Sequence, residues 1–220
     1  MLLSMNVIEL FSSIDGEGKR QGFLTTFLRL HDCNIRCSYC DTLYSYGPES
    51  TFESMSVQAV ADVIEQLENH RITVTGGEPL LQEPAIIELI DELTRRNARY
   101  DFNIETNGTI IPSFHRDNVW FTYDYKTPSS LAEDAMNLDI FKVATPADII
   151  KFVVGSMQDL DRMDEILKTY PTDAQIFVSP VWGTIEGATI IEYMKAHDWQ
   201  NVRFQLQIHK FIWDPDAKGV

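Results

Sequence analysis

The chain has 220 residues, 44% of them hydrophobic, which is enough to bury a substantial core. Its formal net charge of −15 would repel phosphate backbones, so we expect a small-molecule substrate and no direct contact with nucleic acid. No run of 18 apolar residues offers a membrane span, and residues 1–10 lack the pattern of a signal peptide. We therefore expect a single domain over residues 1–220, in the reducing cytoplasm and away from membranes.

The predicted elements alternate between strands and helices along the chain. In chain order they are a strand at 23–30, a helix at 57–67 capped by Ser56, a strand at 72–75, a helix at 84–97, strands at 102–105, 119–123 and 149–154, a helix at 157–168, a strand at 175–178, a helix at 188–196 and a strand at 202–207. This alternation is typical of an α/β fold with a mostly parallel sheet. The helices are too few for a complete eight-unit barrel, so we expect a partial, open βα barrel of about six parallel strands.

Polar motifs follow several of these strands at the point where each strand ends. They are the cysteine loop 33–40, Thr75–Pro79, Glu105–Gly108 and Asp124–Lys126. In parallel α/β folds the functional residues gather at this edge of the sheet. We therefore expect these four segments to form one site.

The three cysteines, Cys33, Cys37 and Cys40, lie within eight residues of one another. A disulfide would leave one thiol over and would require a tight, strained loop. A structural zinc ion normally has four ligands, and although His31 or Asp41 could complete such a set, the usual second ligand pair further along the chain is missing. Three thiolates can instead hold three corners of a [4Fe-4S] cluster and leave one iron without a protein ligand. We predict such a cluster here.

The C-x3-C-x2-C spacing resembles that of the radical S-adenosylmethionine (SAM) enzymes, and so do Gly76–Pro79 and Glu105–Gly108. Taken alone, each of the last two segments could be a simple turn. The resemblance implies the radical SAM core fold, with SAM bound through its amino and carboxylate groups to the free iron.

Further segments resemble one family within this superfamily, the 7-carboxy-7-deazaguanine synthases, often called QueE. These segments are Ile14–Gly18, Arg29, Cys40–Thr42, Lys126–Ser129 and the Trp-containing tail that ends at 218–220. The resemblance runs from about Ile8 to the C-terminus. It implies a carbon–nitrogen lyase that converts 6-carboxy-5,6,7,8-tetrahydropterin to 7-carboxy-7-deazaguanine with loss of ammonia, in the biosynthesis of queuosine and related deazapurines. It further implies bound Mg²⁺, a flavodoxin or ferredoxin as electron donor, and a homodimer.

The same resemblance assigns roles residue by residue. Cys33, Cys37 and Cys40 hold the cluster, and Thr42 binds Mg²⁺. The substrate-binding residues are Ile14, Asp15, Gly16, Glu17, Arg29, Thr75, His209 and Val220, with segment 205–220 closing on the active site. The residues expected to contact SAM are Ser38, Tyr39, Gly77, Glu78, Glu105, Asp124, Tyr125, Lys126 and Ser129. As alternatives, Arg29 could form a surface ion pair and Asp41-Thr42 could cap the following segment.

The chain departs from the family pattern at three places. Asp15 replaces the usual Gln, which exchanges an amide for an acceptor-only carboxylate and would alter one hydrogen bond to the pterin. Asp32 replaces the usual Gly before the first cysteine, so we expect positive φ to be less accessible there. Asp124-Tyr125 replaces the commoner Ser-Pro before Lys126, which puts their side-chain contacts with SAM in doubt.

Two other functions remain open at this point. A glycyl-radical activating enzyme would use the same cluster and SAM but act on a protein partner. A non-catalytic iron–sulfur or zinc protein would leave the glycine turn, Arg29 and Thr42 without a joint purpose.

Overall fold

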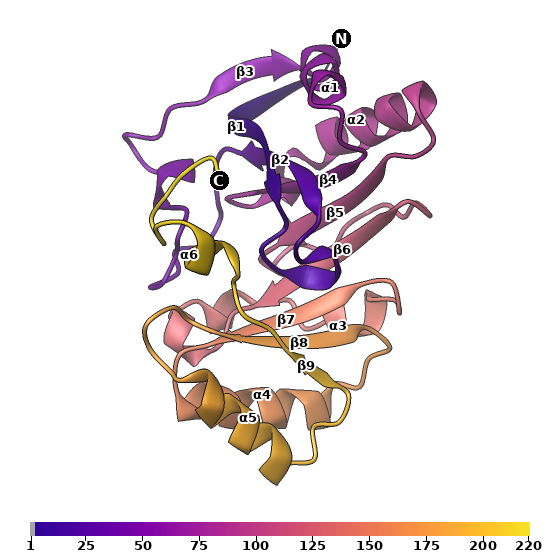
Figure 1. Cartoon of the computed structure of the whole chain (residues 1–220). Helices are drawn as coiled ribbons and strands as arrows, with labels where there is room; N and C mark the ends of the chain where they lie inside the picture. Colours follow the sequence, from indigo (N-terminus) through magenta and orange to yellow (C-terminus); the bar gives the residue numbers. More distant parts are fainter. Residues whose placement is uncertain (1–2) are drawn as a thin grey trace.

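The structure is a computed structural model that describes residues 3–220. These residues form one nine-stranded sheet with the order β3-β1-β2-β4-β5-β6-β7-β8-β9 (Figure 1). The strands are β1 (Ser4–Ile14), β2 (Leu24–Leu30), β3 (Glu53–Ser56), β4 (Arg71–Gly76), β5 (Asp101–Thr106), β6 (Val119–Tyr125), β7 (Ile149–Val154), β8 (Gln175–Pro180) and β9 (Val202–Phe204). Residues 1–2, at the start of the segment examined for a signal peptide, lie outside the described part.

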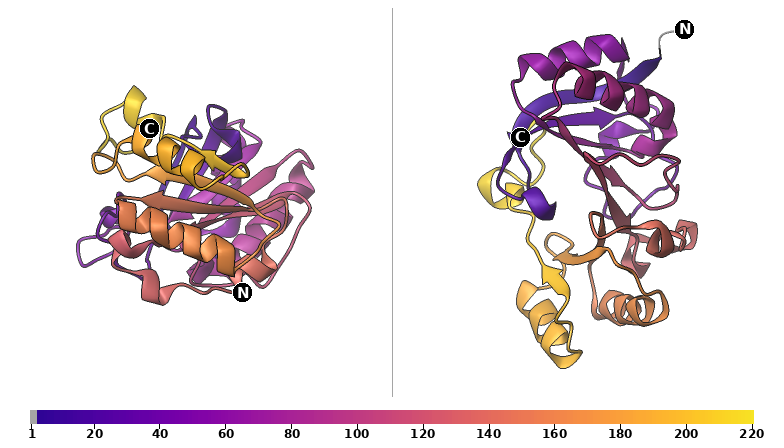
Figure 2. Two further views of the ribbon diagram at one scale, coloured as in Figure 1. Left: turned by 90° about the horizontal axis from the view of Figure 1, so that it is seen from below. Right: turned by 90° about the vertical axis from the view of Figure 1, so that its right-hand side faces the viewer.

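The described strands from β2 to β9 run parallel to one another, and the sheet does not close into a barrel. The prediction of an open, mostly parallel βα barrel is thereby confirmed. The sheet is curved, and the longer helices pack against its outer side while the C-terminal segment lies on its inner side (Figure 2). The helices are α1 (Val57–Gln66), α2 (Glu83–Arg96), α3 (Ile140–Val143), α4 (Met157–Thr169), α5 (Gly187–Ala196) and α6 (His209–Ile212), with 3-10 turns η1 (Gly18–Arg20), η2 (Leu43–Ser45), η3 (Pro79–Gln82), η4 (Pro128–Ser130) and η5 (Glu133–Ala135).

Local sequence explains where these helices begin. The side chain of Ser56 accepts a hydrogen bond from the Ala59 amide at 3.2 Å, so the predicted cap of α1 is confirmed. Ser156 caps α4 in the same way through the Asp159 amide at 3.3 Å. In the described residues, no helix combines the length and the apolar character needed to cross a lipid bilayer.

The strands alternate between an apolar outer face and a polar inner face. In β4, Ile72 and Val74 are fully buried in the hydrophobic core, whereas Thr75 lines a cavity on the inner side of the sheet. In β7, Ile150 and Phe152 likewise belong to the core while Lys151 lines the cavity. Successive side chains of a strand point to opposite faces, so the same strands build both the core and the site.

The sequence predictions missed β1 and β3, which extend the sheet with antiparallel pairing. The pairing of β1 with β2 shifts between Val7 and Glu9, so the apolar residues of β1 do not keep a two-residue period. The predicted strand 202–207 was too long. β9 ends at Phe204, and the side chain of the next residue, Gln205, makes hydrogen bonds to the Gly18 backbone.

Candidate active site

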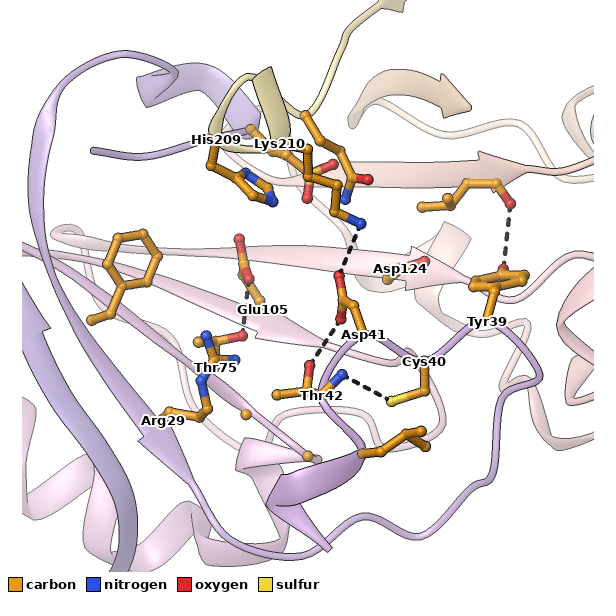
Figure 3. A pocket seen from close by; sticks show the side chains of 18 of the residues that line it. Arg29, Tyr39, Cys40, Asp41, Thr42, Thr75, Glu105, Asp124, His209 and Lys210 are labelled. Atoms are coloured by element: carbon orange, nitrogen blue, oxygen red, sulfur yellow. Dashed lines mark hydrogen bonds and ion pairs between the residues drawn. The ribbon is translucent and has the colours of Figure 1, made fainter. Parts of the chain in front are cut away.

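A cavity of about 560 Å³ lies on the inner side of the sheet (Figure 3). Most of the residues predicted for the site line it: Ile14, Asp15, Gly16, Glu17, Arg29, Cys33, Cys37, Tyr39, Cys40, Thr42, Thr75, Gly77, Glu105, Asp124, Lys126, His209 and Val220. The predicted residues that do not line it are Ser38, Glu78, Tyr125 and Ser129. The sequence motifs are therefore brought together in space, although they come from segments spread over the whole chain.

The cysteine loop forms one wall of the cavity, and its three thiols are free and partly buried. Burial raises the pKa of Cys33, and it raises the pKa of Cys37 to about 11 against the opposing charge of Lys126. Two of the sulfurs already accept hydrogen bonds, Cys33 Sγ from Asn107 Nδ2 at 3.7 Å and Cys40 Sγ from the Thr42 amide at 3.4 Å. Such bonds also tune cluster-bound sulfurs, so the loop fits a [4Fe-4S] group with three cysteine ligands.

The arrangement of these side chains differs from that of a single-metal site. Within residues 3–220, no three His, Cys, Asp or Glu side chains gather as ligands of one metal ion. A zinc ion would need its ligands around one point, whereas an iron–sulfur cluster takes one sulfur for each iron.

The loop at the end of β4 packs closely against the start of the cysteine loop. The Gly77 amide donates to the Leu30 carbonyl at 3.1 Å, and the Glu78 amide donates to the Asp32 carbonyl at 2.8 Å. A Cβ atom on Gly77 would lie 1.8 Å from the Asp32 carbonyl oxygen, so only glycine allows this approach. Asp32 itself adopts a φ of 80°, and its side chain accepts a hydrogen bond from the Cys33 amide. The expected loss of positive φ at Asp32 was therefore wrong, because Asp tolerates this region when it bonds locally.

Glu78 is completely buried, and its side chain makes hydrogen bonds to backbone amides and to Thr106. Its carboxylate accepts hydrogen bonds from the Leu80 amide at 2.9 Å, from Thr106 Oγ1 at 2.9 Å and from the Asn107 amide at 2.7 Å. These bonds hold the start of η3 against the end of β5. The structure thus gives Glu78 a positioning contact between two loops, and its predicted contact with SAM remains a prediction.

The other three residues outside the cavity also have partners elsewhere. Tyr125 donates to Glu133 at 2.8 Å on the far face of β6, because it alternates with Asp124. The Ser38 hydroxyl donates to the Ser129 carbonyl at 2.5 Å, which ties the cysteine loop to η4. Their predicted contacts with SAM remain predictions.

Lys151 is a cavity residue that the sequence reasoning missed. Its ammonium lies 3.1 Å from Glu17 Oε2 and 3.5 Å from Asp124 Oδ2, while Lys126 lies 3.1 Å from the same Asp124 oxygen. The signal was a lysine within the apolar run Ile149–Val154, in the middle of a strand and not at its end. The predicted site contained strand-end residues and therefore did not include Lys151.

Glu105 lines the cavity and accepts a hydrogen bond from Thr75 Oγ1 at 2.9 Å. Burial raises the pKa of Glu105 to about 7, and the charges of Glu17 and Asp15 add to this effect while Lys151 opposes it. The carboxyl group therefore exists in both protonation states near neutral pH. It can donate or accept a hydrogen bond to a ligand as the ligand requires.

Asp15 lies in the predicted substrate loop, but its carboxylate is bound within the protein. Asp15 Oδ2 is 3.0 Å from both Arg20 Nε and Thr25 Oγ1, and Arg20 continues to Asp101 Oδ1 at 2.6 Å. Burial raises the pKa of Asp15, although Arg20 lowers it in opposition. The carboxylate that stands here in place of the family's Gln is thus paired with the buried guanidinium of Arg20. The expected altered hydrogen bond to a pterin stays a prediction.

Arg29 projects from β2 into the cavity beside the cysteine loop (Figure 3). Its Nε atom lies 3.0 Å from Glu9 Oε2, and Tyr44 donates to the same Glu9 oxygen at 3.1 Å. Within the described residues the two Nη groups of Arg29 have no hydrogen-bond partner. These groups form a fork that matches a ligand carboxylate.

Segment 205–220 covers the cavity and contacts the substrate loop directly. The Ile208 amide donates to the Gly16 carbonyl at 3.1 Å, and the Gln205 amide group makes hydrogen bonds of 2.7 and 2.9 Å to the Gly18 backbone. The His209 ring lies so close that a Cβ atom on Gly16 would be 1.9 Å from its Nδ1 atom. The substrate loop and this segment therefore form one packed unit.

The side chains of His209 and Lys210 point from α6 toward the strands (Figure 3). Burial lowers the pKa of His209, and Lys210 and Lys151 lower it further against the opposing charges of Glu17 and Asp41. The imidazole is therefore neutral at pH 7. Lys210 lies 3.6 Å from Asp41 Oδ2, and Asp41 Oδ1 accepts the Thr42 hydroxyl at 2.9 Å. Gln205, Asp41 and Lys210 were not predicted as site residues, since their partners are distant in sequence or their role is visible only in three dimensions.

Comparison with known proteins gives the same assignment over nearly the whole chain. A sequence profile described as the Radical SAM superfamily matches residues 29–168. The 7-carboxy-7-deazaguanine synthase of Clostridium acetobutylicum is 37% identical over 99% of this chain and 100% of its own length. The enzyme of the same name from Methanospirillum hungatei is 36% identical over 96% of this chain and 86% of its own length.

The fold is also found among solved structures. The crystal structure of QueE from Escherichia coli matches with a TM-score of 0.69 at 23% identity, covering 92% of this chain and 93% of that one. Its fold agrees with the open, mostly parallel sheet described above. The chain therefore belongs to the 7-carboxy-7-deazaguanine synthase family of the radical SAM superfamily.

Proposed function

We propose that this chain is a carbon–nitrogen lyase that converts 6-carboxy-5,6,7,8-tetrahydropterin to 7-carboxy-7-deazaguanine with loss of ammonia. Full-length relatives with this enzyme name are 36–37% identical to it. The observation that supports the proposal most is the content of the cavity. In the described part of the chain, three cysteines, the loop Ile14–Glu17 and the two unpaired Nη groups of Arg29 line one cavity.

Cys33, Cys37 and Cys40 would hold the [4Fe-4S] cluster, and the Thr42 hydroxyl would supply an oxygen ligand to Mg²⁺. When bound, the cluster and SAM supply the reductive cleavage that starts the radical reaction. Gly77, Asp124 and Lys126 lie on the wall next to the cysteine loop, where we place SAM. The protein keeps this chemistry away from water by the cover of segment 205–220.

The substrate is held by groups on the opposite wall. Arg29 binds its carboxylate through the two Nη groups, because the Nε group is already paired with Glu9. Glu105, with a pKa of about 7, and Thr75 form the polar partners of the heterocycle at the inner face of β4 and β5. The His209 ring can donate or accept a hydrogen bond to the substrate on the side of Gly16.

A glycyl-radical activating enzyme would need an open groove that admits a polypeptide. Here the cavity is covered by hydrogen bonds between segment 205–220 and residues 16–18, which disfavours a protein substrate. We further propose a single domain, a homodimer, a flavodoxin or ferredoxin as electron donor, and a cytoplasmic place in the biosynthesis of queuosine or a related deazapurine.

The proposal is tested with protein reconstituted under anaerobic conditions. We expect about four irons per chain, and we expect the deazapurine product when SAM, a reductant, Mg²⁺ and carboxytetrahydropterin are supplied together. Omission of Mg²⁺ tests the role of Thr42, and Cys37→Ala serves as the cluster-free control. Cleavage of SAM without any deazapurine product would contradict the proposal and support the activating-enzyme alternative.

A further inference from the structure

Lys151 occupies an unusual position in the middle of β7. The side chains beside it in sequence, Ile150 and Phe152, are fully buried in the core on the other face of the sheet, and Lys151 itself is only 7% exposed. Asp124 is its register partner on β6, while Glu17 reaches it from a loop 134 residues earlier. A buried ammonium is unfavourable unless it is paired, so these two carboxylates determine whether Lys151 can be accommodated.

Each of the two carboxylates uses one oxygen for Lys151 and leaves the other without a partner. Glu17 Oε2 and Asp124 Oδ2 contact the ammonium at 3.1 and 3.5 Å. Glu17 Oε1 and Asp124 Oδ1 are buried and accept no hydrogen bond from the described residues. A buried acceptor without a donor is costly, which indicates that a bound ligand supplies the donor in each case.

The two carboxylates belong to different parts of the proposed site. Glu17 follows the substrate loop, and Asp124 lies at the strand end that we assign to SAM. We propose, on the basis of the function proposed above, that Lys151 is a positioning residue that holds the carboxylates of Glu17 and Asp124 in place, so that one ammonium supports both the pterin site and the SAM site.

The charges around Lys151 support this role. Burial lowers the pKa of Lys151, but Glu17, Asp124 and Glu105 raise it by more, so the ammonium stays protonated. Asp124 has a second cation in Lys126 at 3.1 Å, whereas Lys151 is the one cation within ion-pair distance of Glu17 in the described residues. Removal of Lys151 therefore affects the pterin side more than the SAM side.

The test compares Lys151→Met, Lys151→Arg and the double variant Lys151→Met/Glu17→Gln. Reconstituted protein is titrated with SAM alone and with carboxytetrahydropterin alone, and the cluster's EPR signal is followed when SAM is added. We expect Lys151→Met to weaken pterin binding about a hundredfold and SAM binding about tenfold. Lys151→Arg keeps the charge and should remain within a few-fold of the unchanged protein. The exposed pair Lys142 and Asp139 offers a matched control, because Lys142→Met removes a lysine with no contact to the cavity.

The double variant separates positioning from folding. Glu17→Gln removes the unpaired buried charge that Lys151→Met creates, so we expect it to restore thermal stability and the SAM-induced EPR change but not pterin affinity. If Lys151→Met does not fold, the affinities of Lys151→Arg and of the double variant for the two ligands are compared instead. Unchanged affinities for both ligands, or a loss for SAM alone, would overturn the inference. Failure of the unchanged protein to bind pterin would refute the proposed function. The SAM affinities of the Lys151 variants would still show whether Lys151 supports the SAM side of the site.

Discussion

Replacement of Gly16 by alanine should separate catalysis from folding. The added Cβ atom would lie 1.9 Å from His209 Nδ1. A normal contact requires about 3.5 Å, so the ring must move by about 1.6 Å. Because the Ile208 amide also bonds the Gly16 carbonyl, the start of α6 moves with it. A displacement of about 1 Å at a reacting group can cost about a hundredfold in rate, so we expect a loss of this size in kcat/KM.

Steady-state formation of the deazapurine by Gly16→Ala measures this effect directly. The iron content and the affinity for SAM should stay within a factor of about two, because the change lies on the substrate side of the cavity. Gly187→Ala, at the first residue of α5 and outside the cavity wall, is the matched control: its Cβ would lie 3.0 Å from Phe204 Cζ, so it also crowds a neighbouring ring but should leave the kinetics unchanged. An active Gly16→Ala variant with normal kcat/KM would show that the position of His209 has no part in the reaction.

Three further changes test other contacts of the site. Glu105→Gln tests the raised pKa of Glu105. In the unchanged protein the native state binds the Glu105 proton more tightly than the unfolded state does. The resulting contribution to the free energy of unfolding is fully present below pH 4.5 and is lost as the pH rises toward about 7. At about 1.4 kcal/mol per pH unit, urea unfolding should favour the Gln variant over the unchanged protein by up to about 3 kcal/mol more at pH 8 than at pH 4; a constant difference would contradict the assignment. Arg29→Lys should raise the KM for the pterin about tenfold and leave the affinity for SAM unchanged, because one ammonium cannot pair with Glu9 and also hold the substrate carboxylate with two parallel bonds. An unaltered KM would show that the substrate carboxylate binds elsewhere. Gln205→Leu leaves the Gly18 amide and carbonyl without their hydrogen-bond partners, which costs about 2 kcal/mol. Limited proteolysis should therefore cleave segment 205–220 faster than in the exposed control Gln200→Leu. Equal cleavage rates would show that this contact does not hold the segment.

The sequence alone identified the parts of the protein whose signal is local. The cysteine spacing pointed to the cluster and to the radical SAM superfamily, and alternating strand and helix patterns gave the open parallel sheet. These features need only neighbouring residues, because helix caps, strand periodicity and metal-ligand spacing all act within a few positions of one another. The antiparallel β1 was missed, since its irregular pairing at Val7 and Glu9 disrupts the period.

Only the tertiary structure decided which charges and amides pair between segments that lie far apart in the chain. Lys151 meets Glu17 across 134 residues, and Gln205 meets Gly18 across 187. Asp15, in the predicted substrate loop, pairs with Arg20, a residue that the sequence analysis had not connected with it. The energy of an ion pair or hydrogen bond depends on distance and burial in space, and neither quantity is encoded in the spacing of residues along a chain.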